Sequence, residues 1–343
     1  MLTINHFLQI LILGKFYSEQ EQFQEAVSHF ENYSAVANKL QDKKEMCSAT
    51  HNLAYAYYRL HNYNESIEFY EENISLANDL DDRESLSMAY CNLGLAYLAM
   101  NDFEKAVRCQ KLFLASAREK KNTVNVCKAL GNLGKIYIQM GDVEEGLRFH
   151  YEQVKAAEKR SNNTLKADCY HELANVLQAE NNLSEAANYF EKELAIRRQP
   201  DEKPHLFYQC LYSYASLLER TEKLEEAHKC YCEAFQHAKQ MGYLDECKTV
   251  CQLMGRINMR MGKYEKAVIA FRLQLECIND TVEDSIESGH VHLDISECYK
   301  AMGNTDNAIH HLLSYQQTAT VLQMPSEENQ AYKKLSDLSL IHI

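Results

Sequence analysis

The chain has 343 residues and a formal net charge of −13, with 46% hydrophobic and 25% charged residues. This composition is typical of a folded protein, and the negative charge argues against a broad surface for nucleic acid or anionic membranes, which needs clustered Lys and Arg. Only 3 Pro and 11 Gly are present. These are too few turn-forming residues for a chain with many tight turns, so we expect long helices joined by short loops.

The first 17 residues, MLTINHFLQILILGKFY, are apolar but lack the basic segment and the small-residue cleavage site of a secretory signal. No apolar run approaches the roughly 18 residues needed to span a bilayer. The 12 cysteines are scattered singly, unlike the dense disulfide framework of a small secreted domain. We therefore expect a cytoplasmic location without membrane insertion.

One pattern recurs along the chain from its first helix onward: a Leu or similar residue, a small residue, and usually an aromatic residue three positions after the small one. The spacing is 40 residues for the first five units, and three more units follow with one-residue insertions. The small residues, in chain order, are Gly14, Ala54, Gly94, Gly134, Ala174, Ala215, Gly255 and Ser296. Eight repeating units are therefore visible.

A second small residue follows twelve positions later, and an anchor residue, usually aromatic, stands four residues beyond it. The anchors are Phe30, Tyr70, Gln110, His150, Phe190, Tyr231, Phe271 and Leu312, in which Gln110 and His150 depart from the pattern. Small residues at both places let two antiparallel helices approach closely. Gly and Asn tolerate the left-handed conformation that ends a helix, so we place the turns between the paired helices at Asn101, Gly141, Asn181, Gly262 and Gly303.

These residues resemble the signature of the tetratricopeptide repeat family. The resemblance implies an all-α, right-handed α-solenoid of antiparallel helix pairs, with HEAT repeats as the structural alternative. The 40-residue unit exceeds the usual 34, so we expect a longer second helix or following loop. Long units of this kind are similar to those of LGN-type adaptors and rapsyn, although the chain lacks the myristoylatable Gly and zinc cluster of rapsyn and the Gα-binding tail of LGN.

We expect a single solenoid over residues 1–343, with eight helix pairs and a C-terminal half-repeat. A bend is expected at 197–205, where Pro200 and Pro204 accompany an inserted residue; two subdomains are the alternative. In the half-repeat, Leu335 and Ser336 fall in phase with the signature, and we expect Leu338, Leu340, Ile341 and Ile343 to be sparsely covered.

No catalytic or phosphate-binding motif is recognisable, so the sequence predicts neither an enzyme nor a cofactor. Four cysteines could be considered as zinc ligands, but no compact ligand loop accompanies them, and burial in helix packing is the favoured interpretation. They are Cys230, Cys232, Cys247 and Cys251. His290, His292, His310 and His311 are set aside as well, since neighbouring helical positions point in different directions.

The resemblance places a peptide-binding groove on the first helix of each pair. Asn52, Asn92 and Asn132 precede the signature Leu in three successive units, and an Asn side chain can donate to and accept from a peptide backbone. An equally weighted interpretation is that they bridge neighbouring helices. Other groove positions hold Tyr55, Arg59, Lys135, Gln139, Asn175, Arg220, Arg256 and Arg260. Their cations suit an acidic peptide, although solvated helix surface remains the favoured interpretation of the charges.

The sequence thus predicts a non-catalytic scaffold or adaptor that binds a segment of another protein in its groove, and the groove cations suggest that this segment is acidic. Two alternatives remain: an architectural assembly subunit, and the substrate-recruiting arm of a larger enzyme. A receptor for chaperone tails is disfavoured, because no three successive units supply the Lys, Asn and Arg of the family's two-carboxylate clamp. The sequence identifies neither the partner nor the oligomeric state.

Overall fold

The computed structural model describes residues 4–199, 204–279 and 285–339, and all regular secondary structure in these ranges is α-helical. The predicted all-α helical solenoid is confirmed. The chain forms two compact units, Met1–Leu173 and Ala174–Ile343. The boundary lies within a helix, α9, and the single solenoid over the whole chain stays a prediction.

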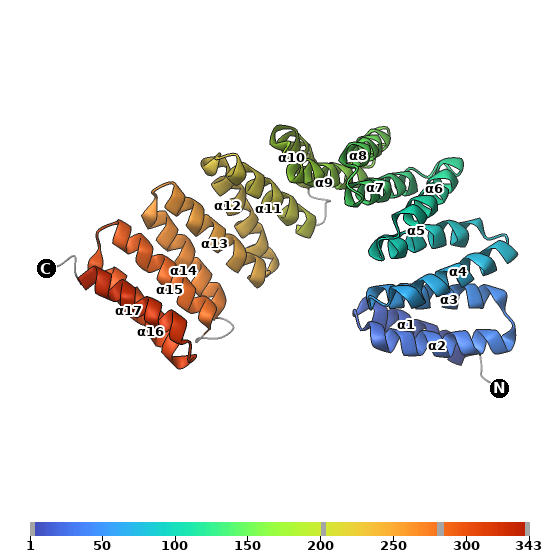
Figure 1. The fold of residues 1–343 in the computed structure, drawn as a ribbon, viewed down its shortest axis with the longest axis horizontal. Coiled ribbons are helices and arrows are strands. Elements are labelled where there is room, and N and C mark those ends of the chain that lie inside the picture. The colour runs from blue at the N-terminus through green and yellow to red at the C-terminus, as the bar shows by residue number, and fades with distance from the viewer. Residues whose placement is uncertain (1–3, 200–203, 280–284, 340–343) are drawn as a thin grey trace. The chain divides into compact units, whose positions relative to one another are not determined.

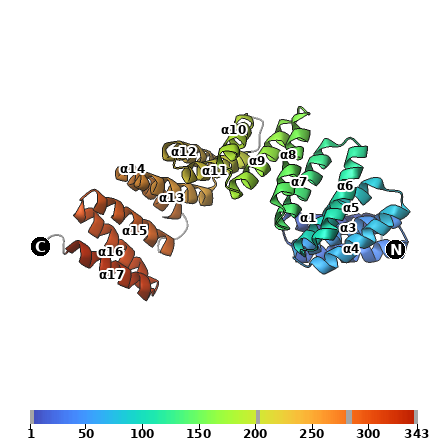
Figure 2. The ribbon, with the colours of Figure 1, turned by 45° about the horizontal axis from the view of Figure 1, so that its top comes forward.

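Each unit consists of helices that pack in chain order on their sequence neighbours (Figure 1). The first unit contains α1 (Ile4–Glu19), α2 (Phe23–Leu40), α3 (Lys43–Arg59), α4 (Tyr63–Asp79), α5 (Arg83–Ala99), α6 (Phe103–Glu119), α7 (Thr123–Gln139), α8 (Val143–Glu158) and most of α9 (Asn163–Ala179). The second contains the end of α9 and α10 (Leu183–Arg197), α11 (Pro204–Arg220), α12 (Leu224–Met241), α13 (Leu244–Arg260), α14 (Tyr264–Asn279), α15 (Ile286–Ala301), α16 (Thr305–Val321) and α17 (Pro325–Ser339). In Figure 2, α13 to α17 again lie side by side in this order.

The helices, rather than the loops, contain the extra residues of the 40-residue repeat. Helices α3 to α7 each contain 17 residues, and only three residues separate each helix from the next. The predicted turn residues Asn101, Gly141, Asn181, Gly262 and Gly303 all have positive φ, between 60° and 89°. Glu21, His61 and Glu222 adopt the same conformation in the remaining units. The turn prediction is confirmed, and of the two places expected for the extra residues, a longer helix or a longer loop, the loop is excluded by the three-residue connections between α3 and α7.

The small residue of each signature makes room for the anchor residue of its partner helix. A Cβ added at Gly14 would lie 2.5 Å from the ring of Phe30, and one added at Gly255 would lie 2.4 Å from Phe271. Both distances are far below van der Waals contact. The register predicted from the 40-residue spacing therefore fixes how the two helices of a pair pack.

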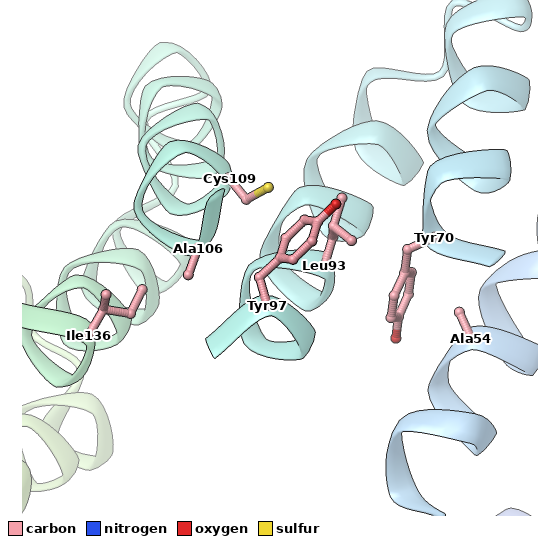
Figure 3. Packing of buried hydrophobic residues seen from close by; sticks show 7 residues of the cluster. All are labelled: Ala54, Tyr70, Leu93, Tyr97, Ala106, Cys109 and Ile136. Carbon is pink, nitrogen blue, oxygen red and sulfur yellow. The ribbon is translucent and has the colours of Figure 1, made fainter. Parts of the chain in front are cut away.

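Neighbouring helix pairs of the first unit share a hydrophobic cluster that reaches from α3 to α7. Figure 3 shows Leu93 and Tyr97 of α5 between Tyr70 on one side and Ala106 on the other. The hydroxyl of Tyr97 donates to Glu71 of the preceding pair at 2.7 Å, so the signature tyrosine links neighbouring repeats. Since each repeat buries its apolar face only against the next, stacking supplies the stability that a single helix pair lacks.

The two irregular regions predicted from sequence are partly described. Helix α10 ends at Arg197 and α11 begins at Pro204, while residues 200–203 of the predicted bend lie outside the described residues. Helix α17 provides the first helix of the half-repeat. Leu338 is buried against Ala308 and Leu312, so the expectation that it would be sparsely covered is wrong. Leu340, Ile341 and Ile343 lie outside the described residues.

Candidate peptide-binding surface

The first helices of successive pairs form a continuous layer in the first unit. Helix α3 contacts α5, and α5 contacts α7, in addition to the contacts that each makes with its sequence neighbours. Equivalent positions on these helices are 40 residues apart and therefore share one side of the layer. We call this side, which carries Asn52, Asn92 and Asn132, the A-helix face.

Two of the three asparagines donate hydrogen bonds within the protein. Asn52 Nδ2 donates to the carbonyl oxygen of Ser48 at 2.8 Å, and Asn132 Nδ2 donates to Gln110 Oε1 at 3.2 Å. Burial raises the pKa of the Tyr70 hydroxyl, and the nearby Asn92 side chain opposes this rise. Asn132 is only 8% exposed, whereas Asn52 and Asn92 are half-buried. Asn52 and Asn92 are therefore the better-placed groups for an external ligand.

The cations of the first unit bind acidic groups one repeat away. Arg59 donates to Glu21 Oε1 at 3.2 Å and to the Tyr55 hydroxyl at 2.9 Å, and its guanidinium lies 4.4 Å from the ring centre of Phe23. Tyr55 and Gln139 are exposed. Because such surface ion pairs contribute only about 0–1 kcal/mol, a partner carboxylate could compete for Arg59 at little energetic cost.

Behind the A-helix face lies a polar network built around the atypical anchor His150. His150 Nδ1 donates to Gln153 Oε1 at 3.0 Å, Gln153 Nε2 donates to Glu172 Oε2 at 2.7 Å, and Lys135 Nζ donates to Glu172 Oε1 at 2.7 Å. Burial raises the pKa of Glu172, but Lys135, Gln153 and His150 outweigh it and the pKa is lowered overall. Burial lowers the pKa of His150 despite the Gln153 hydrogen bond. Lys135 is therefore paired with the carboxylate of Glu172. Glu172 occupies the position at which earlier repeats have Asn52, Asn92 and Asn132.

In the second unit, two of the predicted groove arginines also join successive repeats. Arg220 donates to the carbonyl oxygen of Gln178 at 3.1 Å, and Arg260 donates to Glu219 at 2.6 Å. Arg256 and Asn175 are exposed. Arg256 lies near Asp294 and counteracts the rise in the pKa of that carboxyl, which burial causes. Arg256 thus interacts electrostatically with the next repeat through Asp294.

Sequence reasoning missed Lys128, an exposed residue one helical turn before Asn132. Its ammonium group lies near the Cys91 thiol and opposes the rise in the thiol pKa that burial causes. Lys128 was missed because only positions from the residue before the signature Leu onward were considered. The i, i+4 relation to Asn132 is the signal that could have identified it, since residues four apart share a helix face.

The four cysteines considered as zinc ligands are free thiols, of which Cys247 and Cys251 are buried. In the ranges 4–199, 204–279 and 285–339, no group of three or more His, Cys, Asp or Glu side chains is arranged to hold a metal ion. Within the same ranges, no helix has the length and apolar character needed to cross a bilayer.

Family models for the tetratricopeptide repeat match residues 45–119, 125–199 and 248–277, together just over half of the chain. The chain belongs to the tetratricopeptide repeat family. The matched segments contain the phased helix pairs described above, so the family assignment rests on the same residues as the packing. No curated protein sequence matches the chain. The closer similarity to LGN-type adaptors and rapsyn stays a prediction.

Solved structures agree with this assignment at the level of the fold. The quorum sensor NprR from B. thuringiensis, in its apo form, is 13% identical with a TM-score of 0.56, covering 97% of this chain and 87% of its own. A tetratricopeptide-repeat STAND ATPase from Pyrococcus horikoshii is 12% identical with a TM-score of 0.65, covering 96% and 48%. A putative kinesin light chain repeat protein from Podospora anserina is 23% identical with a TM-score of 0.51, covering 59% and 100%.

Proposed function

We propose that this tetratricopeptide repeat chain is a non-catalytic scaffold or adaptor that binds an extended segment of another protein on its A-helix face. The observation that carries the proposal is the half-buried pair Asn52 and Asn92 at equivalent positions of contacting helices. Since the chain's own side chains and backbone hold these amides in place, a ligand would meet polar groups that are already ordered. Among the described residues, the A-helix face offers hydrogen-bonding groups rather than a nucleophile paired with a base.

The partner segment is proposed to be acidic. Lys128 is exposed and Arg59 is partly exposed on the same layer, and Arg256 provides an exposed cation in the second unit. An arginine can bind a carboxylate through two parallel hydrogen bonds, which gives direction as well as charge complementarity. The free thiols of the described residues support the proposal of a reducing compartment, the cytoplasm.

Affinity purification of the intact chain followed by mass spectrometry tests the proposal when it is compared with two variants. Asn52→Ala/Asn92→Ala changes the A-helix face, and Asn32→Ala changes an exposed Asn on α2 as the matched control. We expect the partners captured by the wild type and by Asn32→Ala to be lost or depleted with the double variant, while all three proteins stay equally helical. Equal capture by the folded double variant would move the binding site away from this face.

The architectural alternative has one specific observation in its favour. Helix α1 exposes Leu8, Ile12, Leu13 and Phe16, whereas Leu53, which occupies the position of Leu13 in the next repeat, is 1% exposed. A contiguous apolar helix face of this kind is typical of an interaction surface. Light scattering over a concentration series would show association of the wild type, reduced by Ile12→Lys, if this face joins chains.

A further inference from the structure

Two histidines from paired helices of the second unit lie against each other, with an angle of 28° between their ring planes. His292 of α15 and His311 of α16 place their Nδ1 atoms 2.9 Å apart, with ring centres separated by 5.1 Å. The Tyr299 ring stacks on His311 at 5.7 Å between centres. Two neutral imidazoles in this arrangement share one hydrogen bond, in which one ring donates and the other accepts.

The two positions vary from repeat to repeat. The positions of His292 and His311 are occupied by Leu130 and Phe149 in the fourth repeat, where both residues belong to a buried apolar cluster. The other repeats hold different pairs: Ile10 and His29, Thr50 and Phe69, Tyr90 and Cys109, Tyr170 and Tyr189, Leu211 and Cys230, and Cys251 and Ala270. No other repeat has histidine at both positions, so the pair of imidazoles is particular to the eighth repeat.

Burial disfavours the charged form of both rings. Burial and then His310 lower the pKa of His292. Burial, then His292, His310 and Arg272, lower the pKa of His311 to about 4. Both rings are only partly buried, so solvent and small ions can reach them.

We propose that His292 and His311 together bind a divalent transition-metal ion of the class that prefers imidazole nitrogen, such as Zn²⁺, through their Nδ1 atoms. A tetrahedral Zn²⁺ with Zn–N bonds of about 2.0–2.1 Å separates two ligand nitrogens by roughly 3.3 Å. The pair therefore opens by a few tenths of an ångström and tilts so that both lone pairs converge on the ion. The imidazole proton between the rings moves to Nε2, so each ring remains neutral with one N–H.

Water completes the coordination, since the pair supplies two ligands and the described residues contain no three-ligand cluster. Arg272 lies close enough to affect His311 and also donates to the Tyr299 hydroxyl at 3.0 Å. Its positive charge opposes a cation, which makes the site weaker than a closed structural zinc site. A weak, open site leaves coordination positions for exchangeable ligands.

Zinc titration of the full chain by calorimetry, in a thiol-reducing and chelator-free buffer, tests the proposal. The test variant His292→Leu/His311→Phe restores the side chains of the fourth repeat and so preserves packing. The matched control His290→Gln changes another histidine of α15, whose ring lies against Tyr315 instead. We expect the wild type and the control to bind one more equivalent of Zn²⁺ than the double variant.

Zinc should also raise the melting temperature of the wild type more than that of the double variant, because binding to the folded state stabilises it. His311→Phe alone provides a second variant if the double variant folds poorly, and it should lose the same equivalent. Equal stoichiometry and equal zinc-dependent melting shifts in the wild type and a folded variant would overturn the proposal. The pair would then be an imidazole–imidazole hydrogen bond only.

Discussion

Replacing Gly134 with leucine should destabilise the first unit, because α7 and α8 pack very closely at this residue. A Cβ at Gly134 would lie 2.6 Å from two ring atoms of His150 and 3.1 Å from the carbonyl oxygen of Gly146. His150 is fully buried and its ring is rigid, so neither neighbour can move away without shifting a helix. Glycine at this position is required by the close approach of the helices.

The expected magnitude combines two opposing effects. Overpacking costs about 1–3 kcal/mol, and leucine, with three carbons more than alanine, belongs at the upper end. The better helix propensity of leucine returns roughly 1 kcal/mol. The net loss of unfolding free energy is then about 2 kcal/mol, which lowers the melting temperature of a unit of this size by about 4–8 °C.

Thermal and urea unfolding followed by circular dichroism measure this loss. Gln139→Leu is the matched control, because Gln139 is an exposed residue of the same helix and its replacement adds an apolar side chain without a clash. The reasoning about helix packing would be refuted if Gly134→Leu were as stable as the wild type, or if the control lost as much stability.

Three further predictions concern polar contacts in the first unit. Tyr97→Phe removes the hydrogen bond to Glu71 and should lower the free energy of unfolding by about 0.5–1.5 kcal/mol in urea denaturation; an unchanged midpoint would mean that this contact between repeats contributes nothing. Because burial lowers the pKa of His150, the unfolded state binds more protons below about pH 6.5, so stability should fall as the pH drops from 7 to 5 and fall less in His150→Phe; parallel pH profiles would contradict this. Lys135→Met should cost about 0.5–1 kcal/mol at pH 7, and the difference from the wild type should vanish as the pH falls below the ordinary range of a glutamate carboxyl and Glu172, whose pKa is lowered in the folded state, becomes protonated; a difference independent of pH would contradict the ion pair.

The repeat was predictable from sequence because each signature position requires either a particular side-chain size or a particular backbone conformation. Gly14, Phe30 and the turn residue Asn101 belong to types chosen for size or for backbone conformation, and the structure uses each as expected. The turn residues Glu21 and Glu222 could not be recognised, since Glu is not a residue type that favours positive φ. Their conformation follows from the repeat spacing rather than from their own preference.

The polar contacts of the candidate surface were much less predictable. Gln110 and His150 looked like defects in the anchor pattern, yet Gln110 accepts from Asn132 and His150 is joined through Gln153 to Glu172. A one-dimensional pattern shows that a residue departs from the repeat but does not show which side chain of the next repeat compensates for it. The contacts of the long cationic side chains were hidden for the same reason.

The buried position of Asn132 also changes how the surface should be tested. Its amide donates to Gln110, so removing it would leave a buried acceptor without its partner and disturb the helices themselves. Asn52 and Asn92 are half-buried and can be changed with less effect on the core. A loss of binding after their replacement is therefore easier to attribute to the ligand.

Hydrogen–deuterium exchange of the full chain, with and without a partner protein that it captures, tests the proposed binding surface most directly. We predict added protection in the A helices α3, α5 and α7, diminished in Asn52→Ala/Asn92→Ala and reduced at high salt, because screening weakens the attraction of the cations for an acidic segment. Protection confined to α2, α4, α6 and α8, with no change in α3, α5 or α7, would contradict the proposed binding surface.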